Sequence, residues 1–373
     1  MSTGGDGPTG HDPHVAPSAG WHPNPARVVV ATIMGVLVAL LGLAFMPRVP
    51  SLSTQVTGDQ DLAAQSLPHL GGALDVVSIA TVDAGTIRYA GFGADETTVY
   101  EIGSVTKTFT SAALADAISR GEVTADTKLG DLLPVRGTPV EDVTLAELAS
   151  HRSGLPRVGT SPTVPENLRL LTHRDAFTQN LPDLLDVARS ARLTNRGRYA
   201  YSNLGTALLG EGLASVANTD YRQLMQQRIF GPLGMSSTTV PITGSDLPAD
   251  ASEGYGADGQ PHKASVTHAW APAGGMRSTV ADMTAYATAL LNGSAPGMAA
   301  LTPRWDQGHG TRVGYAWNTM QLDAKTVTFH GGATGGFCAT IALDRANHRA
   351  VIILSNTRAP VEDAALTLLG GMS

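Results

Sequence analysis

The sequence predicts an α+β fold in which one antiparallel sheet is built from both ends of a domain and flanked by helices, with a mostly helical insertion between them. Strand-like patterns occur on the N-terminal side of this domain and return near residue 312, while the segments between them have helical periodicity. An uncharged apolar run also precedes the domain. It adds one N-terminal transmembrane helix to the predicted architecture.

The N-terminal region is predicted to be a tail followed by a membrane anchor. Residues 1–27 are rich in Gly, Pro and Ser and lack apolar periodicity, which is typical of a disordered tail. The run Val28–Met46 has 19 uncharged residues, enough to span a bilayer as a helix. A buried helix and a cleaved signal peptide are the alternatives. The abrupt polar flanks argue against the first, and the absence of a small-x-small pattern at Ala44-Phe-Met46 argues against the second.

Residues 47–64 are predicted to be a linker, and residues 65–373 the globular domain, with a helical subdomain over about 120–300. Strands are expected at Leu74–Val82, Thr86–Phe92, Thr97–Ile102, Arg312–Met320, Thr326–Phe329, Phe337–Asp344 and Ala350–Leu354. Helices are expected at Leu62–Leu70, from Ser104 to Ser119, and at Leu145–Ala149, Leu181–Ala191, Asn203–Ala217, Tyr221–Ile229, Val280–Leu291 and Val361–Leu369.

Composition excludes several classes of protein. The net charge of -7 argues against a general nucleic-acid binder, which needs a basic face. A single cysteine, Cys338, excludes an internal disulfide and a cysteine-rich zinc site, and we expect it to pack in a core strand. Neither a metal nor a cofactor is expected, and the oligomeric state is not determined by the sequence.

The turn around Ser104 is the first candidate for chemistry. Lys107 follows Ser104 by three residues at the expected start of a helix, so the two side chains share one helical face. A lysine whose charged form is disfavoured can take the proton of a serine hydroxyl, which makes the serine a nucleophile. The Ser104 amide at a helix N-terminus favours developing negative charge. The alternative is an exposed helical Ser and Lys.

Two further segments carry candidate residues. In Tyr201-Ser-Asn203, the phenol is a candidate general acid or base, and the amide of Asn203 can orient Lys107 or a substrate. In His330-Gly-Gly-Ala333, the glycines allow close approach of a ligand, and His330 can donate to a substrate carboxylate or assist proton transfer. Gly332 belongs to this segment. The amide of Ala333 is the candidate second oxyanion donor.

Together these segments resemble the serine β-lactamase and penicillin-binding-protein superfamily. The branch they resemble contains class C β-lactamases, D-alanyl-D-alanine carboxypeptidases, D-aminopeptidases and related esterases. Ser104-Val-Thr-Lys107, Tyr201-Ser-Asn203 and His330-Gly-Gly332 match its three motifs in order. The resemblance covers about residues 65–373, and its supporting stretches are Ser150–Pro156, Phe230–Met235 and Ala273–Met283. Within this pattern His151 has no catalytic role and is expected to be structural.

The resemblance implies a serine hydrolase that forms an acyl-enzyme at Ser104, and the apolar run Val28–Met46 is expected to anchor it in the membrane. The expected activity is a D-alanyl-D-alanine carboxypeptidase on peptidoglycan-type peptides, located at the cell membrane with its domain outside the cytoplasm. A carboxylesterase and a β-lactamase are alternatives. The β-lactamase is disfavoured because class C enzymes have Lys-Thr-Gly where this chain has His330-Gly-Gly332. A non-catalytic sensor of cell-wall peptides or lipids is the alternative from another class.

Overall fold

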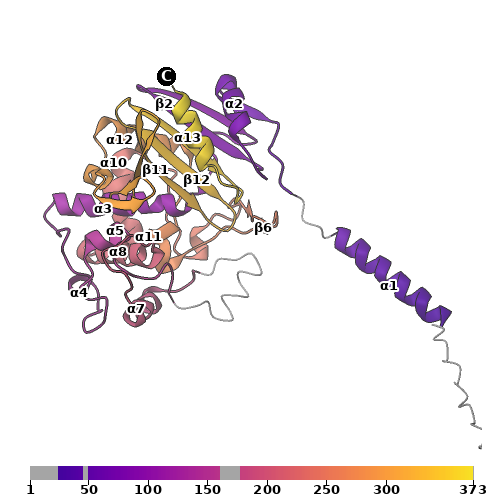
Figure 1. Ribbon diagram of the computed structural model, residues 1–373, viewed down its shortest axis with the longest axis horizontal. Helices are drawn as coiled ribbons and strands as arrows, with labels where there is room; N and C mark the ends of the chain where they lie inside the picture. Colours follow the sequence, from indigo (N-terminus) through magenta and orange to yellow (C-terminus); the bar gives the residue numbers. More distant parts are fainter. Residues whose placement is uncertain (1–23, 45–48, 160–176, 373) are drawn as a thin grey trace, which may run out of the picture. The chain divides into compact units, whose positions relative to one another are not determined.

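A computed structural model describes residues 24–44, 49–159 and 177–372 of the chain. It divides into two compact units, Met1–Pro47 and Arg48–Ser373. In the first unit a single helix, α1 (Pro25–Ala44), is described (Figure 1). Residues 1–23 of the predicted disordered tail lie outside the described residues, and α1 begins inside the last part of that prediction.

The apolar run predicted as a membrane anchor lies mostly in α1. The backbone N–H of Ala26 donates to Asn24 Oδ1 at 3.0 Å, which satisfies a free donor at the start of the helix. Its valines are solvent-exposed; Val30, for example, is 60% exposed. However, in the described part of the chain no helix reaches the length and apolar character of a membrane span. The transmembrane prediction for residues 28–46 is therefore not supported.

The second unit contains a nine-stranded antiparallel sheet in the order β1-β3-β2-β13-β12-β11-β10-β9-β8 (Figure 1). Strands from the two ends of this unit meet at its centre, where β2 pairs with β13 and Ile79 lies opposite Ile353. The strands are β1 (Val56–Gly58), β2 (Val77–Asp83), β3 (Thr86–Phe92), β8 (Trp305–Gly308), β9 (Thr311–Val313), β10 (Asn318–Leu322), β11 (Lys325–Ala333), β12 (Cys338–Asp344) and β13 (Arg349–Ser355). This arrangement agrees with the predicted α+β class.

The central strands are buried on both faces, which explains their nearly continuous apolar runs. In β13, Ile352 and Leu354 belong to the larger core cluster, whereas Val351 and Ile353 belong to the smaller one, as the two-residue period of a strand requires. The smaller cluster is closed by α2 (Gln60–Ser66) and α13 (Glu362–Gly371). The larger cluster extends to the helices on the other side of the sheet.

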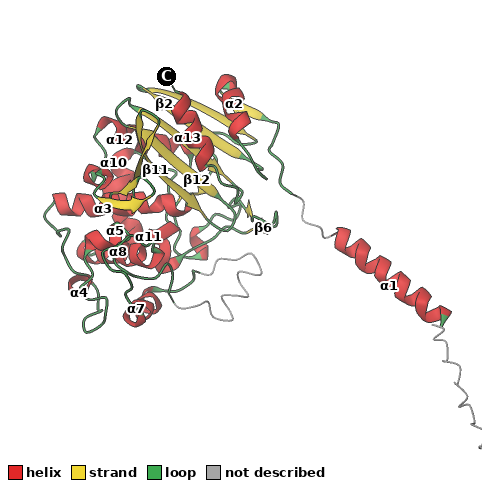
Figure 2. Cartoon of the chain, viewed as in Figure 1, coloured by secondary structure: helices red, strands yellow, loops and turns green. Residues whose placement is uncertain are grey.

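The segment between the two groups of strands is mainly helical, as predicted (Figure 2). Its helix α12 packs against β2 and β13, and α8 packs against α3. The helices of this region and its border are α3 (Thr106–Ser119), α4 (Leu129–Leu132), α5 (Leu145–Ala149), α7 (Leu181–Ser190), α8 (Asn203–Val216), α9 (Tyr221–Met225), α10 (Gly231–Leu233), α11 (Ala271–Gly274) and α12 (Val280–Asn292). Short strands β5 (Gly254–Tyr255) and β6 (Pro261–His262) pair with each other.

Three predicted elements differ from the structure for identifiable reasons. The linker predicted for residues 47–64 contains β1, an edge strand held by β3, and the start of α2. The predicted strand Arg312–Met320 is broken between β9 and β10, where Ala316 has a positive φ of 63°. The predicted strand Thr97–Ile102 shortens to β4 (Tyr100–Glu101), which pairs with β7 (Arg277–Ser278) in a separate two-stranded sheet.

One carboxyl group in the helical region is held in an unfavourable environment. Glu211 lies on α8, and burial, with a smaller contribution from Asp220, raises its pKa from 4.5 to about 7. The ionised carboxylate is therefore less favourable in the folded protein than in the unfolded chain. Because both states are protonated below pH 4.5, Glu211 begins to cost stability above that pH, and the cost is complete above pH 7.

We expect Glu211→Gln to stabilise the protein more at pH 8 than at pH 5, by about 2 kcal/mol, because the amide removes this cost. Chemical denaturation of both proteins at the two pH values measures the difference. Glu96→Gln, at an exposed glutamate, is the control. An equal gain at both pH values would contradict the account.

Candidate active site

Ser104 lies in a short 3₁₀ turn, Gly103–Val105, that leads from β4 directly into α3. Lys107 is one turn further on, fully buried, and its Nζ donates to Ser104 Oγ at 3.0 Å. The same amine donates to the carbonyl of Ala273 on α11. The three-residue spacing therefore brings amine and hydroxyl together, as the sequence predicts.

The environment of Lys107 favours loss of its proton. Burial is the main cause that lowers its pKa, and the positive charge of Arg157 lowers it further, whereas Tyr201 acts in the opposite direction. Its hydrogen-bond acceptors are a hydroxyl and a carbonyl rather than a carboxylate. An ammonium without a counter-charge is costly in such a site, so the neutral amine, which can accept a proton, is favoured.

Tyr201 approaches the same hydroxyl from the helical region. Its phenol donates to Ser104 Oγ at 2.6 Å, and its ring lies 5.0 Å from Lys107 Nζ. The next residue, Ser202, caps α8 by accepting from the Gly205 N–H at 2.9 Å. Ser104 Oγ thus accepts from two groups, each of which becomes a base for it after losing a proton.

His151 is structural in its contacts, as expected. It is buried, adopts a positive φ of 57°, and its ring lies 4.5 Å from the ring of Tyr201. Its Nδ1 accepts from the Ser202 N–H at 3.2 Å. Burial, followed by the positive charges around it, holds its pKa well below the ordinary value. The neutral ring therefore helps to position Tyr201.

The end of β11 faces Ser104 with a backbone amide. In the hairpin to β12, the Thr334 N–H donates to Phe337 O at 2.9 Å, so the neighbouring pair Ala333 and Cys338 does not exchange hydrogen bonds. The Ala333 N–H therefore points away from β12. β10 begins opposite Phe329, so it does not cover this edge of β11.

Two glycines allow the strand and the turn to approach closely. A Cβ on Gly332 would lie 2.9 Å from Ser104 N, and a Cβ on Gly103 would lie 2.7 Å from Ala333 N. Gly103 also has a positive φ of 47°, a conformation that side chains disfavour. The amides of Ser104 and Ala333 are thus next to each other, the arrangement that an oxyanion site needs.

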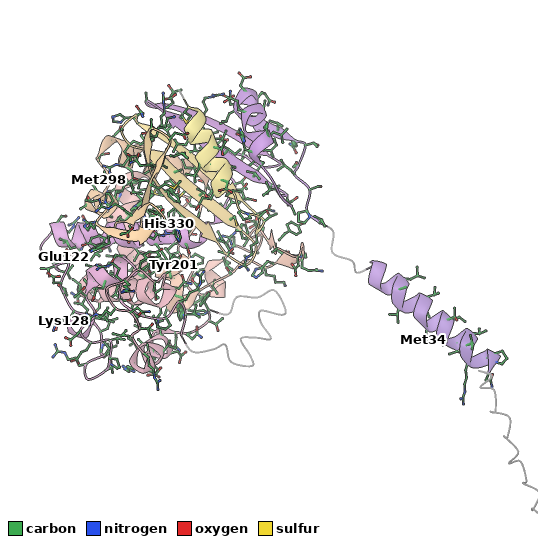
Figure 3. The ribbon with its side chains drawn as sticks, viewed as in Figure 1. Met34, Glu122, Lys128, Tyr201, Met298 and His330 are labelled. Carbon is green, nitrogen blue, oxygen red and sulfur yellow. The ribbon has the colours of Figure 1, made fainter. Side chains whose placement is uncertain are left out.

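His330 is buried at the same site, on the sheet side, whereas Tyr201 comes from the helical insertion (Figure 3). Its Nδ1 is 2.7 Å from Gly331 O, and because a carbonyl only accepts, Nδ1 carries the proton and Nε2 is an acceptor. Burial, and then the charge of Lys107, lower its pKa to about 4. His330 is therefore neutral at pH 7 and brings no positive charge to the site.

The segment after α11 holds the Ser104 turn in place. The Ile102 N–H donates to Met276 O at 3.0 Å, and the Met276 N–H donates to Thr106 Oγ1 at 3.2 Å. Arg277 forms a buried ion pair with Glu101 at 3.3 Å. This accounts for the supporting stretch Ala273–Met283 that the sequence singled out.

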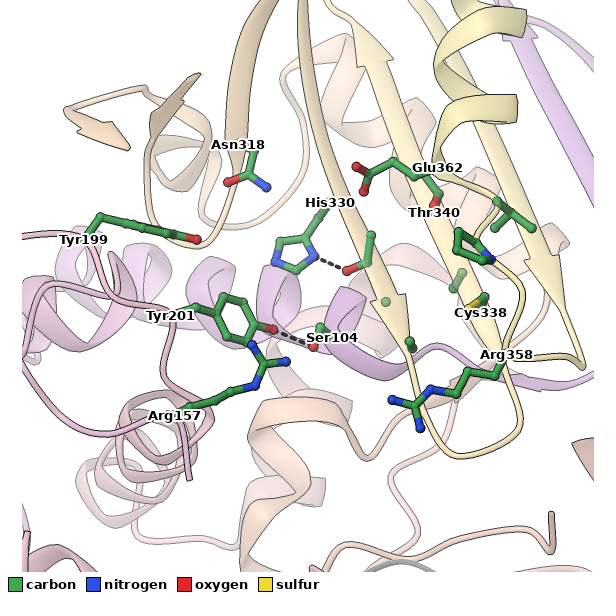
Figure 4. A pocket seen from close by; sticks show the side chains of 16 residues that line it. Ser104, Arg157, Tyr199, Tyr201, Asn318, His330, Cys338, Thr340, Arg358 and Glu362 are labelled. Carbon is green, nitrogen blue, oxygen red and sulfur yellow. Dashed lines mark hydrogen bonds between the residues drawn. The ribbon is translucent and has the colours of Figure 1, made fainter. Parts of the chain in front are cut away.

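A cavity of about 480 Å³ opens at Ser104 (Figure 4). Five predicted site residues line it: Ser104, Tyr201, His330, Gly332 and Ala333. Lys107 is buried behind Ser104. Asn203 does not line the cavity; it begins α8, and its backbone N–H donates to Arg157 O at 2.8 Å. The structure therefore does not bring Asn203 into the cavity with the others.

Other residues that line the cavity were not singled out from the sequence: Arg157, Tyr199, Asn318, Thr340, Arg358 and Glu362. Arg157 directly follows the supporting stretch that ends at Pro156, and this position is a weak indication in the sequence that it lies near the site. Cys338, predicted to pack, is buried at the wall, and burial raises the pKa of its thiol to about 11. Among the described residues, no group of three or more His, Cys, Asp or Glu is placed to hold a metal ion.

Comparison with known proteins identifies the class. A family model described as Beta-lactamase matches residues 63–369, and the chain therefore belongs to the Beta-lactamase family. The β-lactamase of Providencia stuartii is 30% identical over 192 residues, which are 51% of this chain and 46% of that protein. A D-aminopeptidase of Cereibacter sphaeroides is 29% identical over 332 residues, which are 83% of this chain and 62% of that protein.

Solved structures agree on the fold. A β-lactamase/D-alanine carboxypeptidase from Pseudomonas syringae superposes with a TM-score of 0.68 at 20% identity, over 80% of this chain and 94% of that one. The superfamily resemblance and the α+β fold predicted from the motifs are thus confirmed, and the chain is related to serine hydrolases. It spans less than two thirds of the length of both curated relatives named above.

We expect Lys107→Arg to reduce acylation of Ser104 by at least about a hundredfold, because a guanidinium stays protonated and cannot accept a proton. Stopped-flow release of p-nitrophenol from p-nitrophenyl acetate measures the rate, and a thermal unfolding curve serves as the check on folding. Retained activity in a folded variant would mean that a positive charge at position 107 is sufficient for acylation and that no base is needed there.

Proposed function

We propose that the protein is a serine peptidase of the D-alanyl-D-alanine carboxypeptidase type that acts on peptidoglycan-type peptides through an acyl-enzyme at Ser104. One observation carries the proposal. Ser104 Oγ lies 3.0 Å from Lys107 Nζ and 2.6 Å from the Tyr201 hydroxyl, at the wall of an open cavity. A hydroxyl between two proton carriers and next to two backbone amides has what acyl transfer requires.

The proposed acylation begins with attack of Ser104 Oγ on the scissile carbonyl. The serine proton passes to the Lys107–Tyr201 pair as the new C–O bond forms, and the amides of Ser104 and Ala333 stabilise the oxyanion. The C–N bond then breaks, and the pair returns the proton to the leaving amine. In deacylation water attacks the ester carbonyl and gives a proton to the Lys107–Tyr201 pair. The C–O bond to Ser104 then breaks, and the pair returns the proton to Ser104 Oγ.

Positive charge for a substrate carboxylate has to come from residues other than His330. His330, at the third motif, is neutral at pH 7 because its pKa is about 4. Arg157 and Arg358 line the cavity, and guanidinium groups suit carboxylates because they donate two parallel hydrogen bonds. These two arginines support a peptide with a free C-terminal carboxylate as the substrate.

An esterase is the second candidate, and the neutral third motif favours it. The third motif on β11 has the neutral His330 in place of a lysine. The part of β11 that lies beside Ser104 therefore has no positive charge that would require an anionic substrate. A β-lactamase is the third candidate, because the third motif lacks the lysine of class C enzymes. A sensor that binds cell-wall peptides or lipids without turnover is the candidate from another class. Lys107 argues against the sensor, because it is buried with a lowered pKa and its hydrogen bonds are accepted only by a hydroxyl and a carbonyl, an arrangement that suits a base rather than a binding group.

Location at the cell membrane, with the catalytic domain outside the cytoplasm, remains part of the proposal. The exposed valine and leucine side chains of α1 support it, since such a surface is costly in water. Fractionation of cells, followed by protease treatment of intact cells, tests it. Recovery of the whole protein in the soluble fraction would reject it.

The function is tested by measuring intact mass after incubation with a D-Ala-D-Ala peptide, a short-chain nitrophenyl ester and penicillin. We expect the first two to add an acyl group to the native protein, with a longer-lived adduct from penicillin, and Ser104→Ala to remove all three adducts. Labelling that persists in Ser104→Ala would place the nucleophile elsewhere, and no labelling of the native protein would favour the sensor.

Tyr201→Phe is expected to lower kcat by about a hundredfold or more while KM changes little, because the phenol acts on protons in the transition state rather than on bound substrate. Steady-state kinetics on whichever compound turns over measures both constants. An unchanged kcat would remove Tyr201 from the chemistry.

A further inference from the structure

The cavity at Ser104 also contains a carboxylate that the proposed reaction does not use. Glu362 is the first residue of α13, and its side chain lines the same cavity as Ser104. Its carboxylate lies directly against β11, since a Cβ on Gly331 would be 2.3 Å from Glu362 Oε2. Figure 4 shows the carboxylate near Thr340, and Thr340 is the strand partner of Gly331. Because Gly331 has no side chain, the space over this residue is free for the carboxylate of Glu362.

This carboxylate is half-buried and lacks a counter-charge. In the described part of the chain it has neither a hydrogen bond nor an ion pair. Burial raises the pKa of Glu362, and the nearby charge that adds to this effect is Asp363, a like charge. An ionised carboxylate in such a place is stabilised by any cation that enters the cavity.

The charges that line the cavity are separated. Arg157 and Arg358 lie on the other side of Ser104 from Glu362 in Figure 4. Between them His330 is neutral, so it does not repel a cation. Gly331, beneath the carboxylate, precedes the oxyanion residue Ala333 by two positions, which is about 7 Å along a strand.

We propose that Glu362 determines substrate specificity by binding an ammonium group on the acyl part of the substrate, about 7 Å from the scissile carbonyl. The proposal rests on the proposed function, because it concerns what acylates Ser104. The substrate class is then an acyl donor with a primary amine a few bonds from its reactive carbonyl. Glu362 accepts hydrogen bonds from the ammonium, Thr340 Oγ1 is near enough to accept another, and no covalent step is involved.

The test compares two esters of the same chain length, one with a charged amine and one with a neutral amide: p-nitrophenyl 6-aminohexanoate and p-nitrophenyl 6-acetamidohexanoate. Six bonds separate the amine from the carbonyl, close to the required distance. We expect the native protein to react with the amine at least about tenfold more efficiently, the size of one charge-assisted hydrogen bond. In Glu362→Gln the ratio should fall to near one, through KM rather than kcat, while p-nitrophenyl hexanoate reacts as before.

Asp363→Asn is the matched control, because it removes the same charge from the adjacent, exposed position and should leave the ratio unchanged. Equal loss of the preference in both variants would mean a general effect of charge and would overturn the proposal, as would a native protein without the preference. In that case, continued reaction with p-nitrophenyl hexanoate would leave the proposed function standing. Failure of all three esters to label Ser104 would instead reject the proposed function.

A second measurement does not depend on the folding of Glu362→Gln. Hexylamine should slow the acylation of the native protein by p-nitrophenyl acetate at a concentration at least about tenfold lower than hexanol does. Equal inhibition by the two compounds would overturn the proposal.

Discussion

The site depends on one buried amine. Lys107 is enclosed beneath Ser104 and directed by the carbonyl of Ala273, so a group that prefers water is held where its charge is poorly compensated. Burying it costs free energy that packing elsewhere has to offset. In return the amine stays close to the serine hydroxyl with a lowered pKa, and the rest of the site is arranged around that hydroxyl.

Three separate parts of the chain hold this amine and hydroxyl. β11 contributes the Ala333 amide, the segment Ala273–Met276 supports the turn, and the start of α8 brings Tyr201. The two glycines between strand and turn make these parts fit, because any side chain there would separate the two amides. The supporting stretch Ala273–Met283 thus holds the nucleophile in place, and His151 of the stretch Ser150–Pro156 contacts Tyr201.

The sequence predicted the local part of this arrangement. Ser104 and Lys107 are one helical turn apart, so their spacing alone predicts that they meet. Long apolar runs such as those of β12 and β13 predict buried strands without information about the strands that pair with them. Pairings between distant segments are different. Nothing in Thr97–Ile102 shows that its partner is Arg277–Ser278, and short edge strands such as β1 and β8 bury too little to leave a pattern.

The walls of the cavity were unpredictable for the same reason. Arg358 and Glu362 carry no motif, and they line the cavity because β11 and β13 end at the same edge of the sheet, where α13 begins shortly afterwards. Asn203 shows the converse case. Its motif predicts a side chain that orients Lys107 or a substrate, and it is absent from the residues that line the cavity, while its backbone N–H joins the start of α8 to Arg157.

The central pairing of β2 with β13 also governs how the chain can acquire its structure. Val77 pairs with Ser355, so the middle of the sheet joins residues that are made at nearly opposite ends of synthesis. Until β13 is available, β2 pairs only with β3, and α12 lacks one of the two strands on which it mainly packs. Contacts this distant in sequence slow folding, and the helices that pack on the sheet keep apolar surface uncovered until both ends of the domain are present.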